Sequence, residues 1–344
     1  MSNFEFSVIP SVFESAPLNL DRTSNKLITS LKIKHDDDFF IVGDLALTEG
    51  VSPHKEINCS PTGRDYNIFL KSALLVSNTR LGNPLTITTG FPFATYRMNR
   101  DLAQKLIVKE HVIEYDSSLY SSGSIRKTVV EVSSGAIMPE VSSCALAVRK
   151  TRNVNSDFMM ISLGYGTFET VFSTAEGENG VQRTSNSAPG MIYAIELLKK
   201  ALAQEFYSGM PEDYYFDQAL QAGYIFLNRK KYDLKDMRKK VLNQYYDNII
   251  SPNLKKNFTD KEFSKSSGLY LSGGGALYPE IIERFKNEFD GVIDVIIPEN
   301  PNMLAATGYC INSAKLSAGD TSRAVGIDLG NSSTIICYHQ QLSN

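Results

Sequence analysis

The stretch AVGIDLGNSSTIICYHQ, residues 324–340, predicts two β-strands joined by a tight, polar turn. The first strand ends at Asp328, and a second apolar strand starts at Thr334. Gly330 lets the backbone approach a ligand because it has no Cβ, and Asn331–Ser333 offer consecutive N–H groups and short polar side chains that suit phosphates. A carboxylate beside phosphates requires a cation, so Asp328 predicts Mg²⁺ held through water. The alternative is an ordinary Asx-type turn between strands.

Two further glycine turns in the chain have a related layout. Residues 161–169, ISLGYGTFE, predict a strand, a glycine turn, a hydroxyl residue and a second strand. Residues 271–276, LSGGGA, predict a strand that leads through three glycines into a helix, whose N-terminus would face a phosphate. A glycine triplet alone also occurs at sharp strand–helix turns, so the argument depends on the three turns together.

Composition excludes several classes of protein. The chain has 344 residues, is 42% hydrophobic and carries a formal net charge of -3, so no global basic field attracts nucleic acid or an anionic membrane. Four scattered cysteines without a CxxC pair indicate a reducing compartment, and four scattered histidines make a metal-binding cluster improbable. With no signal peptide and no apolar run long enough to span a bilayer, we expect a soluble, cytoplasmic protein.

Strands alternate with helices along the chain, which predicts the α/β class. We expect a hairpin turn at residues 35–38 (the alternative being an acidic metal loop), a strand through residues 36–47, and helices at 97–110, 190–206 and twice within 211–250. Residues 229–231 and 238–240 form the basic cluster, interpreted as a solvated helix face or, alternatively, a charged protein contact. Residues 313–324 are small and polar and predict a flexible linker.

Taken together, the three glycine turns resemble the motifs of the actin-like ATPase superfamily. Residues 328–334 match its first phosphate motif, 164–169 its second and 271–276 its adenosine motif. The two connecting helices of the family are similar to residues 136–141 (AIMPEV) and 301–308 (PNMLAATG). Within the superfamily, the Met-Pro-Glu connection and the early VIPS stretch are most similar to plasmid-segregation actins of the ParM/StbA type. The resemblance implies a two-lobed, duplicated ribonuclease H-like α/β fold with a nucleotide cleft.

The order of the motifs differs from the family, because the first phosphate motif comes last. Moving residues 323–344 in front of residue 1 restores the usual order, so we expect a circular permutant, natural or engineered. The expected division is a first lobe at residues 1–150, a second at 151–316, a linker at 317–322, and a hairpin at 323–344 that completes the first lobe.

The resemblance also implies the cofactors and the chemistry: ATP, or GTP, with Mg²⁺, hydrolysed by in-line attack of water on the γ-phosphate. Glu140 matches the residue that orients this water, although a glutamate after Pro139 would also suit a helix start. Ser162 stands where the family usually has aspartate, so we expect slow hydrolysis. The remaining candidates share a phosphate- or nucleoside-binding role, with Asp328 holding the metal: Gly330, Asn331, Ser332, Ser333, Gly164, Tyr165, Gly166, Thr167, Gly273, Gly274 and Gly275.

The function implied is a polymerising ATPase whose filaments separate plasmid copies. Its partners would be further copies of itself and a DNA-binding adaptor of the ParR type, without direct contact to nucleic acid or membrane. The alternatives are an MreB-like cytoskeletal protein, a small-molecule kinase, which needs a catalytic aspartate and usually a longer chain, and a chaperone ATPase, which needs a peptide-binding domain.

Overall fold

The computed structural model describes residues 4–17, 20, 24–54, 60–121, 123–175, 183–184, 188–205 and 213–340. The chain divides into two compact units: unit 1 comprises residues 1–147 and 305–344, and unit 2 comprises residues 148–304. Each unit contains its own sheet and its own hydrophobic core. Within the described ranges, every helix is too short or too polar to serve as a membrane span.

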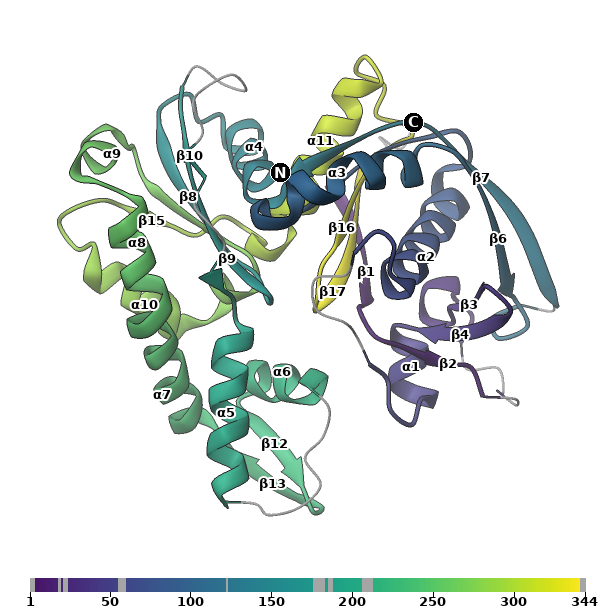
Figure 1. Cartoon of the computed structure of the whole chain (residues 1–344), viewed down its shortest axis with the longest axis horizontal. Coiled ribbons are helices and arrows are strands. Elements are labelled where there is room, and N and C mark those ends of the chain that lie inside the picture. Colours follow the sequence, from purple (N-terminus) through teal and green to yellow (C-terminus); the bar gives the residue numbers. More distant parts are fainter. Residues whose placement is uncertain are drawn as a thin grey trace. The chain divides into compact units, whose positions relative to one another are not determined.

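Unit 1 is built on a nine-stranded sheet in the order β1-β17-β16-β5-β7-β6-β3-β4-β2 (Figure 1). Its strands are β1 (Phe4–Pro10), β2 (Phe13–Ser15), β3 (Lys32–His35), β4 (Asp38–Val42), β5 (Leu85–Phe91), β6 (Glu110–Asp116), β7 (Ile125–Pro139), β16 (Ala324–Leu329) and β17 (Ser333–His339). Its helices are η1 (Leu27–Thr29), α1 (Asp44–Glu49), α2 (Arg64–Leu81), α3 (Phe93–Ile107), most of α4 (Glu140–Arg152) and nearly all of α11 (Leu304–Leu316).

The β16–β17 hairpin lies inside this sheet. β16 pairs in parallel with β5 and antiparallel with β17, and β17 pairs antiparallel with β1, so that Phe4 lies opposite His339. The first and last described strands are therefore neighbours. The hairpin turn expected across residues 341–344 lies outside the described residues.

Side chains along β16 alternate between the two faces of the sheet, and each face packs against a different part of unit 1. Val325 and Ile327 are fully buried in the core that α2 also enters. Gly326 faces α11, where a Cβ would lie 2.1 Å from the Ala306 oxygen and 2.3 Å from the Cys310 nitrogen. This close helix–strand approach requires glycine, and it places Asp328, two residues further on, on the same face as Gly326.

The two helices predicted as connections, α4 and α11, pack closely within unit 1 (Figure 1). A Cβ on Gly308 would lie 2.0 Å from the Ser143 oxygen, and the Ser143 hydroxyl donates to the Ala305 oxygen at 2.8 Å. The contact brings α11 into unit 1, so our assignment of residues 305–316 to the second lobe was wrong. The flexible linker predicted at residues 313–324 is shorter, because residues 313–316 belong to α11 and Ala324 starts β16. Within residues 317–322, Ser317 donates to the Asp320 oxygen and the Asp320 carboxylate accepts from the Ser322 N–H.

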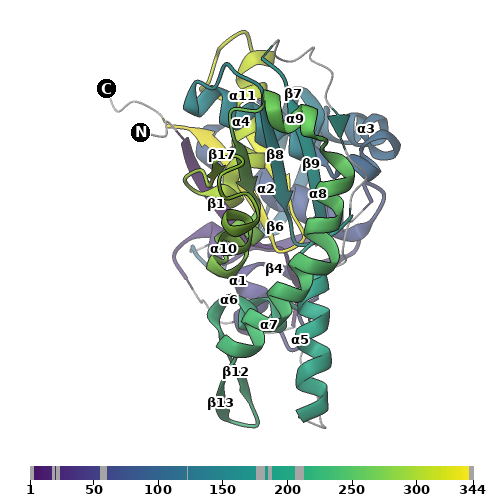
Figure 2. The same cartoon turned by 90° about the vertical axis from the view of Figure 1, so that its left-hand side faces the viewer.

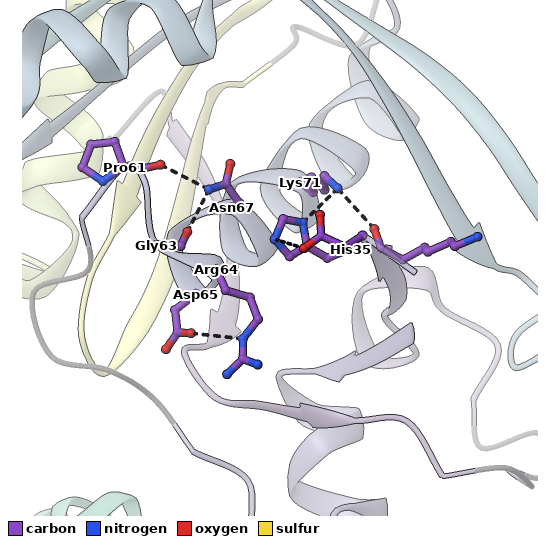
Figure 3. Close-up of polar contacts among 9 residues, drawn as sticks. His35, Pro61, Gly63, Arg64, Asp65, Asn67 and Lys71 are labelled. Carbon is purple, nitrogen blue, oxygen red and sulfur yellow. Dashed lines mark hydrogen bonds and ion pairs between the residues drawn. The ribbon is translucent and has the colours of Figure 1, made fainter. Parts of the chain in front are cut away.

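The hairpin turn predicted at residues 35–38 is confirmed, with His35 opposite Asp38 and Asp36 in the left-handed region. Figure 3 shows how α2 holds this turn: the Lys71 ammonium lies 3.2 Å from His35 Nδ1 and donates to the Lys34 oxygen. Burial, followed by the Lys71 charge, lowers the pKa of His35, which favours the neutral ring that can accept this hydrogen bond. At the start of α2, the Asn67 amide donates to the Pro61 and Gly63 oxygens.

Unit 2 contains a six-stranded sheet in the order β10-β9-β8-β14-β15, with β11 paired to β9, and a separate β12–β13 hairpin. Its strands are β8 (Phe158–Leu163), β9 (Thr167–Ser173), β10 (Arg183–Thr184), β11 (Ala188–Pro189), β12 (Tyr224–Leu227), β13 (Lys230–Asp233), β14 (Leu269–Ser272) and β15 (Val295–Ile296). Its helices are α5 (Ile192–Glu205), α6 (Asp213–Ala222), α7 (Lys235–Tyr245), the π-helix η3 (Tyr246–Ile250), α8 (Ser251–Asn257), α9 (Asp260–Lys265), η4 (Gly274–Leu277), α10 (Pro279–Glu288) and η5 (Pro301–Met303).

Three local predictions were wrong. The strand expected through residue 47 ends at Val42, where Gly43 takes a positive φ and α1 begins. The helix expected at 97–110 spans Phe93–Ile107, because Glu110 already belongs to β6. The first half of the basic cluster lies on the β12–β13 hairpin rather than on a helix face: Arg229 is in the turn, where it and Asn228 have positive φ, and Lys230 and Lys231 belong to β13.

Candidate functional site

The turn between β16 and β17 is held by a residue from the other end of the sequence. Ser11, which is 2% exposed, donates its hydroxyl to the Gly330 oxygen at 2.7 Å. Its N–H donates to the Ser332 oxygen at 3.1 Å, and its hydroxyl lies 3.2 Å from the Thr334 hydroxyl. The turn is thus fixed by contacts from outside the hairpin, as a preformed binding loop requires.

Asp328 and Glu140 form a pair of carboxylates in unit 1. Asp328 lies near the end of β16, and Glu140 begins α4 directly after β7 ends at Pro139. Burial of its carboxyl, followed by the negative charge of Glu140, holds the pKa of Asp328 well above its usual range, although the residue keeps some exposed surface. Each negative charge makes ionisation of the other carboxyl group less favourable. A divalent cation bound beside them would stabilise both carboxylates in their charged form.

In unit 2, the turn between β8 and β9 is held by the segment that enters α5. The N–H groups of Gly190, Met191 and Ile192 donate to the oxygens of Gly166, Gly164 and Tyr165, at 3.1, 3.0 and 2.8 Å. The Gly164 N–H donates to the Thr167 oxygen at 2.9 Å, which closes the turn itself. The carbonyl oxygens of this turn therefore bond within unit 2.

The glycine triplet packs on the end of β8, next to the same turn. Gly273 has a φ of 81°, its N–H donates to the Pro301 oxygen, and a Cβ there would lie 2.4 Å from the Leu163 oxygen. A Cβ on Gly275 would lie 2.6 Å from the Leu163 Cβ, whereas one on Gly274 would meet no atom within 4 Å. Gly274 is the member of the triplet whose backbone borders open space.

The triplet does not open an α-helix, so that part of the prediction was wrong. Residues 274–277 form the short 3-10 helix η4, and α10 begins only at Pro279, after Tyr278 in an extended conformation. The ring of Pro279 presets the helical φ at this first position of α10, which separates the helix from the glycines.

Ser162 lies within the sheet of unit 2, opposite Glu169 on β9 and Ser272 on β14. It is 1% exposed, and Glu169 is fully buried. The interpretation of Ser162 as the position that lacks an aspartate stays a prediction.

The structure groups the candidates by unit. Unit 1 brings together Glu140, Asp328 and residues 330–333, and unit 2 brings together Ser162, residues 164–167 and residues 273–275. Sequence reasoning did not single out Ser11 or Gly190 as site residues. The only signals were the serine after the strand in VIPS and the glycine that precedes a predicted helix.

We expect Gly190→Ala to lower the melting temperature and to weaken binding at the unit 2 turn. The new Cβ would lie 2.3 Å from the Gly164 oxygen and 2.7 Å from the Tyr165 oxygen, so the turn must shift. Overpacking of this kind costs roughly 1–3 kcal/mol. Thermal melting measures the effect, and Gly274→Ala is the matched control because its Cβ meets nothing. Equal melting temperatures for the two variants would contradict the described packing.

Comparisons with known proteins define the fold. No protein-family model and no curated protein sequence matches the chain. Among solved structures, the archaeal actin homologue Ta0583 matches with a TM-score of 0.69 at 18% identity, over 89% of this chain and 92% of that one. A ParM filament from Clostridium botulinum matches with a TM-score of 0.63 at 15% identity, over 89% and 92%. Bacillus thuringiensis ParM with ATP matches with a TM-score of 0.59 at 16% identity, over 90% and 92%.

The chain is thus an α/β protein that carries glycine-rich turns in each of two units. Its fold is the actin-like fold, and the resemblance found in the sequence is confirmed at this level.

Proposed function

We propose that this protein is a nucleotide-dependent, filament-forming ATPase that binds ATP with Mg²⁺. The observation that carries the proposal is the turn at residues 330–332 in unit 1. Ser11 fixes this turn, and the Asp328–Glu140 pair flanks it. Structures of the same fold include a ParM with ATP and a ParM filament, which supports both halves of the proposal.

In this proposal, the phosphates bind to backbone N–H groups and short side chains of the two turns. Gly330–Ser333 serve this role in unit 1 and Gly164–Thr167 in unit 2, while Gly273–Gly275 border the nucleoside. The contacts of Ser11 and of residues 190–192 use carbonyl oxygens of the turns and fix the conformation of both turns.

The residues of unit 1 fit a magnesium ion held mainly through water and phosphate. Within the described ranges there is no cluster of three or more His, Cys, Asp or Glu side chains that could hold a metal. Mg²⁺ usually takes only one or two protein carboxylates and keeps several waters, so Asp328 is sufficient. When bound, the ion would neutralise phosphate charge during phosphoryl transfer. Glu140 would orient the attacking water and accept its proton.

Plasmid segregation through a DNA-binding adaptor is the role that we propose for such filaments, on the basis of the ParM-type sequence resemblance. We also propose that the order of elements is a circular permutation of the usual actin-like order. The pairing of β1 with β17, with Phe4 opposite His339, supports it, because it makes the first and last described strands neighbours.

Asp328→Asn should raise the stability of the nucleotide-free protein and weaken its binding of ATP and Mg²⁺. A carboxyl group whose pKa is raised in the folded state destabilises that state at every pH above its unfolded pKa, and the penalty grows until the pH passes the folded pKa. At pH 8, Asp328 therefore makes the nucleotide-free protein less stable than a neutral side chain would. We expect the variant to melt at a higher temperature than wild type without nucleotide at pH 8.

The same variant should lose most of the thermal stabilisation that ATP and Mg²⁺ give to the wild type, since ligands that bind only the native state raise its melting temperature. Removal of Mg²⁺ with EDTA should have the same effect on the wild type. Wild-type protein that shows no shift at millimolar ATP and Mg²⁺ would contradict the proposed function.

A further inference from the structure

Residues 188–192 lead into α5 and form the element of unit 2 that holds the β8–β9 turn. In this entry segment, Pro189 lies opposite Thr167 of β9, and the next three N–H groups donate to carbonyl oxygens of the turn. The entry segment also reaches the glycine triplet, because a Cβ on Gly275 would lie 3.0 Å from the Met191 Sδ. Both glycine loops of unit 2 therefore contact the entry segment.

Helix α7 anchors the entry segment from a distant part of the sequence. It lies beside α5 in unit 2 (Figure 2). Its last residue, Tyr245, is fully buried and donates its hydroxyl to the Pro189 oxygen at 3.2 Å. In the π-helix η3 that follows, the Asn248 amide donates at 3.2 Å to the hydroxyl of Tyr193, which lies in the first turn of α5. Two side chains thus hold the entry segment and the start of α5.

A single peptide group connects Tyr245 to the β8–β9 turn. The peptide group between Pro189 and Gly190 accepts from the Tyr245 hydroxyl through its oxygen, and its N–H donates to the Gly166 oxygen at 3.1 Å. Because a peptide group is planar, a bond that fixes its oxygen also fixes the direction of its N–H. Gly190 has no Cβ and restricts its own backbone little, so the bond from Tyr245 is needed to orient this group.

We propose that Tyr245 is a positioning residue of the nucleotide site. Its hydroxyl fixes the Pro189–Gly190 peptide group, and through it holds the β8–β9 turn in the conformation that binds the phosphates of ATP. Asn248 is a second anchor, weaker because it is exposed. A π-helical turn directly follows Tyr245, and such turns are rare and frequently lie at functional sites. The inference rests on the proposed function, and it adds two residues that lie outside the glycine motifs.

The test compares the dissociation constant for ATP with Mg²⁺, measured by isothermal titration calorimetry, with the melting temperature. Tyr245→Phe removes only the hydroxyl. Tyr246→Phe is its matched control, since Tyr246 is the next residue and equally buried, but its ring packs against Phe285 and Arg284 of α10. The binding stoichiometry reports the folded fraction of each variant, so a change in affinity is measured separately from a loss of folded protein.

A second pair of variants tests the exposed anchor, where a substitution leaves the buried core intact. Asn248→Ala removes the bond to the Tyr193 hydroxyl. Asn243→Ala is its control, because Asn243 lies on α7 and its side-chain oxygen accepts instead from Arg284 of α10, at 3.5 Å.

We expect Tyr245→Phe to raise the dissociation constant for ATP by roughly three- to tenfold, as the loss of one hydrogen bond implies. Asn248→Ala should raise it by about threefold, and both controls should stay within about twofold of wild type. If Tyr245 only stabilises the fold, Tyr245→Phe would lower the melting temperature and bind ATP as tightly as Tyr246→Phe.

That result, together with an Asn248→Ala variant that matches Asn243→Ala, would overturn the positioning role. ATP binding by the wild type would then leave the proposed function standing. A folded wild type that does not bind ATP would overturn the proposed function, and the positioning role with it.

Discussion

A chain that ends at Leu316 should neither fold nor bind ATP. The deletion removes β16 and β17, and β16 is hydrogen-bonded to strands on both of its sides. It also removes Val325, Ile327, Ile336 and Tyr338, which are all fully buried in the core of unit 1. Burial of each such side chain contributes roughly 1.5–3 kcal/mol, so the sum is comparable to the whole stability of a typical domain, about 5–15 kcal/mol.

Circular dichroism, thermal melting and ATP titration would measure this result. The control keeps every strand: Asn344 is joined to Phe4, and the chain is opened within residues 317–322. We expect the control to fold and to bind ATP, because β1 and β17 are already neighbours. A truncated chain that melts cooperatively would show that the hairpin is dispensable, and an unfolded control would contradict the permutation.

Glu140→Ala should leave ATP binding nearly unchanged and lower hydrolysis by about 10²–10⁴-fold. A residue that orients water acts in the transition state, so its loss lowers turnover without weakening the ground-state complex. Phosphate release under single-turnover conditions measures the rate, and the thermal shift with ATP measures binding.

Glu140→Gln distinguishes this role from a structural one at the start of α4. Glutamine keeps the size of the side chain but cannot accept the proton, so we expect it to be as slow as alanine. If Glu140 only stabilises the helix start through its charge, the variants should instead lose melting temperature, and turnover should fall no further than ATP binding does.

Local chemistry in the sequence predicted much of the fold. The strand pairs around Gly330 and Gly164, the turn at residues 35–38 and the helix after Pro139 all follow from short-range patterns. The β12–β13 hairpin was missed because each of its strands has only four residues, which is too few for a clear alternation of apolar and polar side chains. The helix α1 was missed because only Gly43 and Asp44 separate the apolar run of β4 from Leu45 and Ala46, which are buried as well.

Of the candidate site, the sequence predicted the glycine turns but not the contacts that hold them. Ser11 and Gly330 are 319 positions apart in sequence, so no local pattern could connect them. Glycine is required at position 190 because a Cβ there would meet three backbone atoms of the turn at residues 164–167. This contact arises from tertiary packing, so the local sequence does not reveal it. Asp328 and Glu140 were each predicted from a motif, whereas their mutual electrostatic effect follows from the fold of unit 1.

The measurement that tests the central claim most directly follows light scattering and phosphate release together after Mg²⁺–ATP is added to the wild-type protein. We predict that scattering rises within the same preparation that releases phosphate, and that it declines as ATP is consumed. A constant baseline in both signals, over protein concentrations up to the millimolar range and with melting showing a folded chain, would contradict the account.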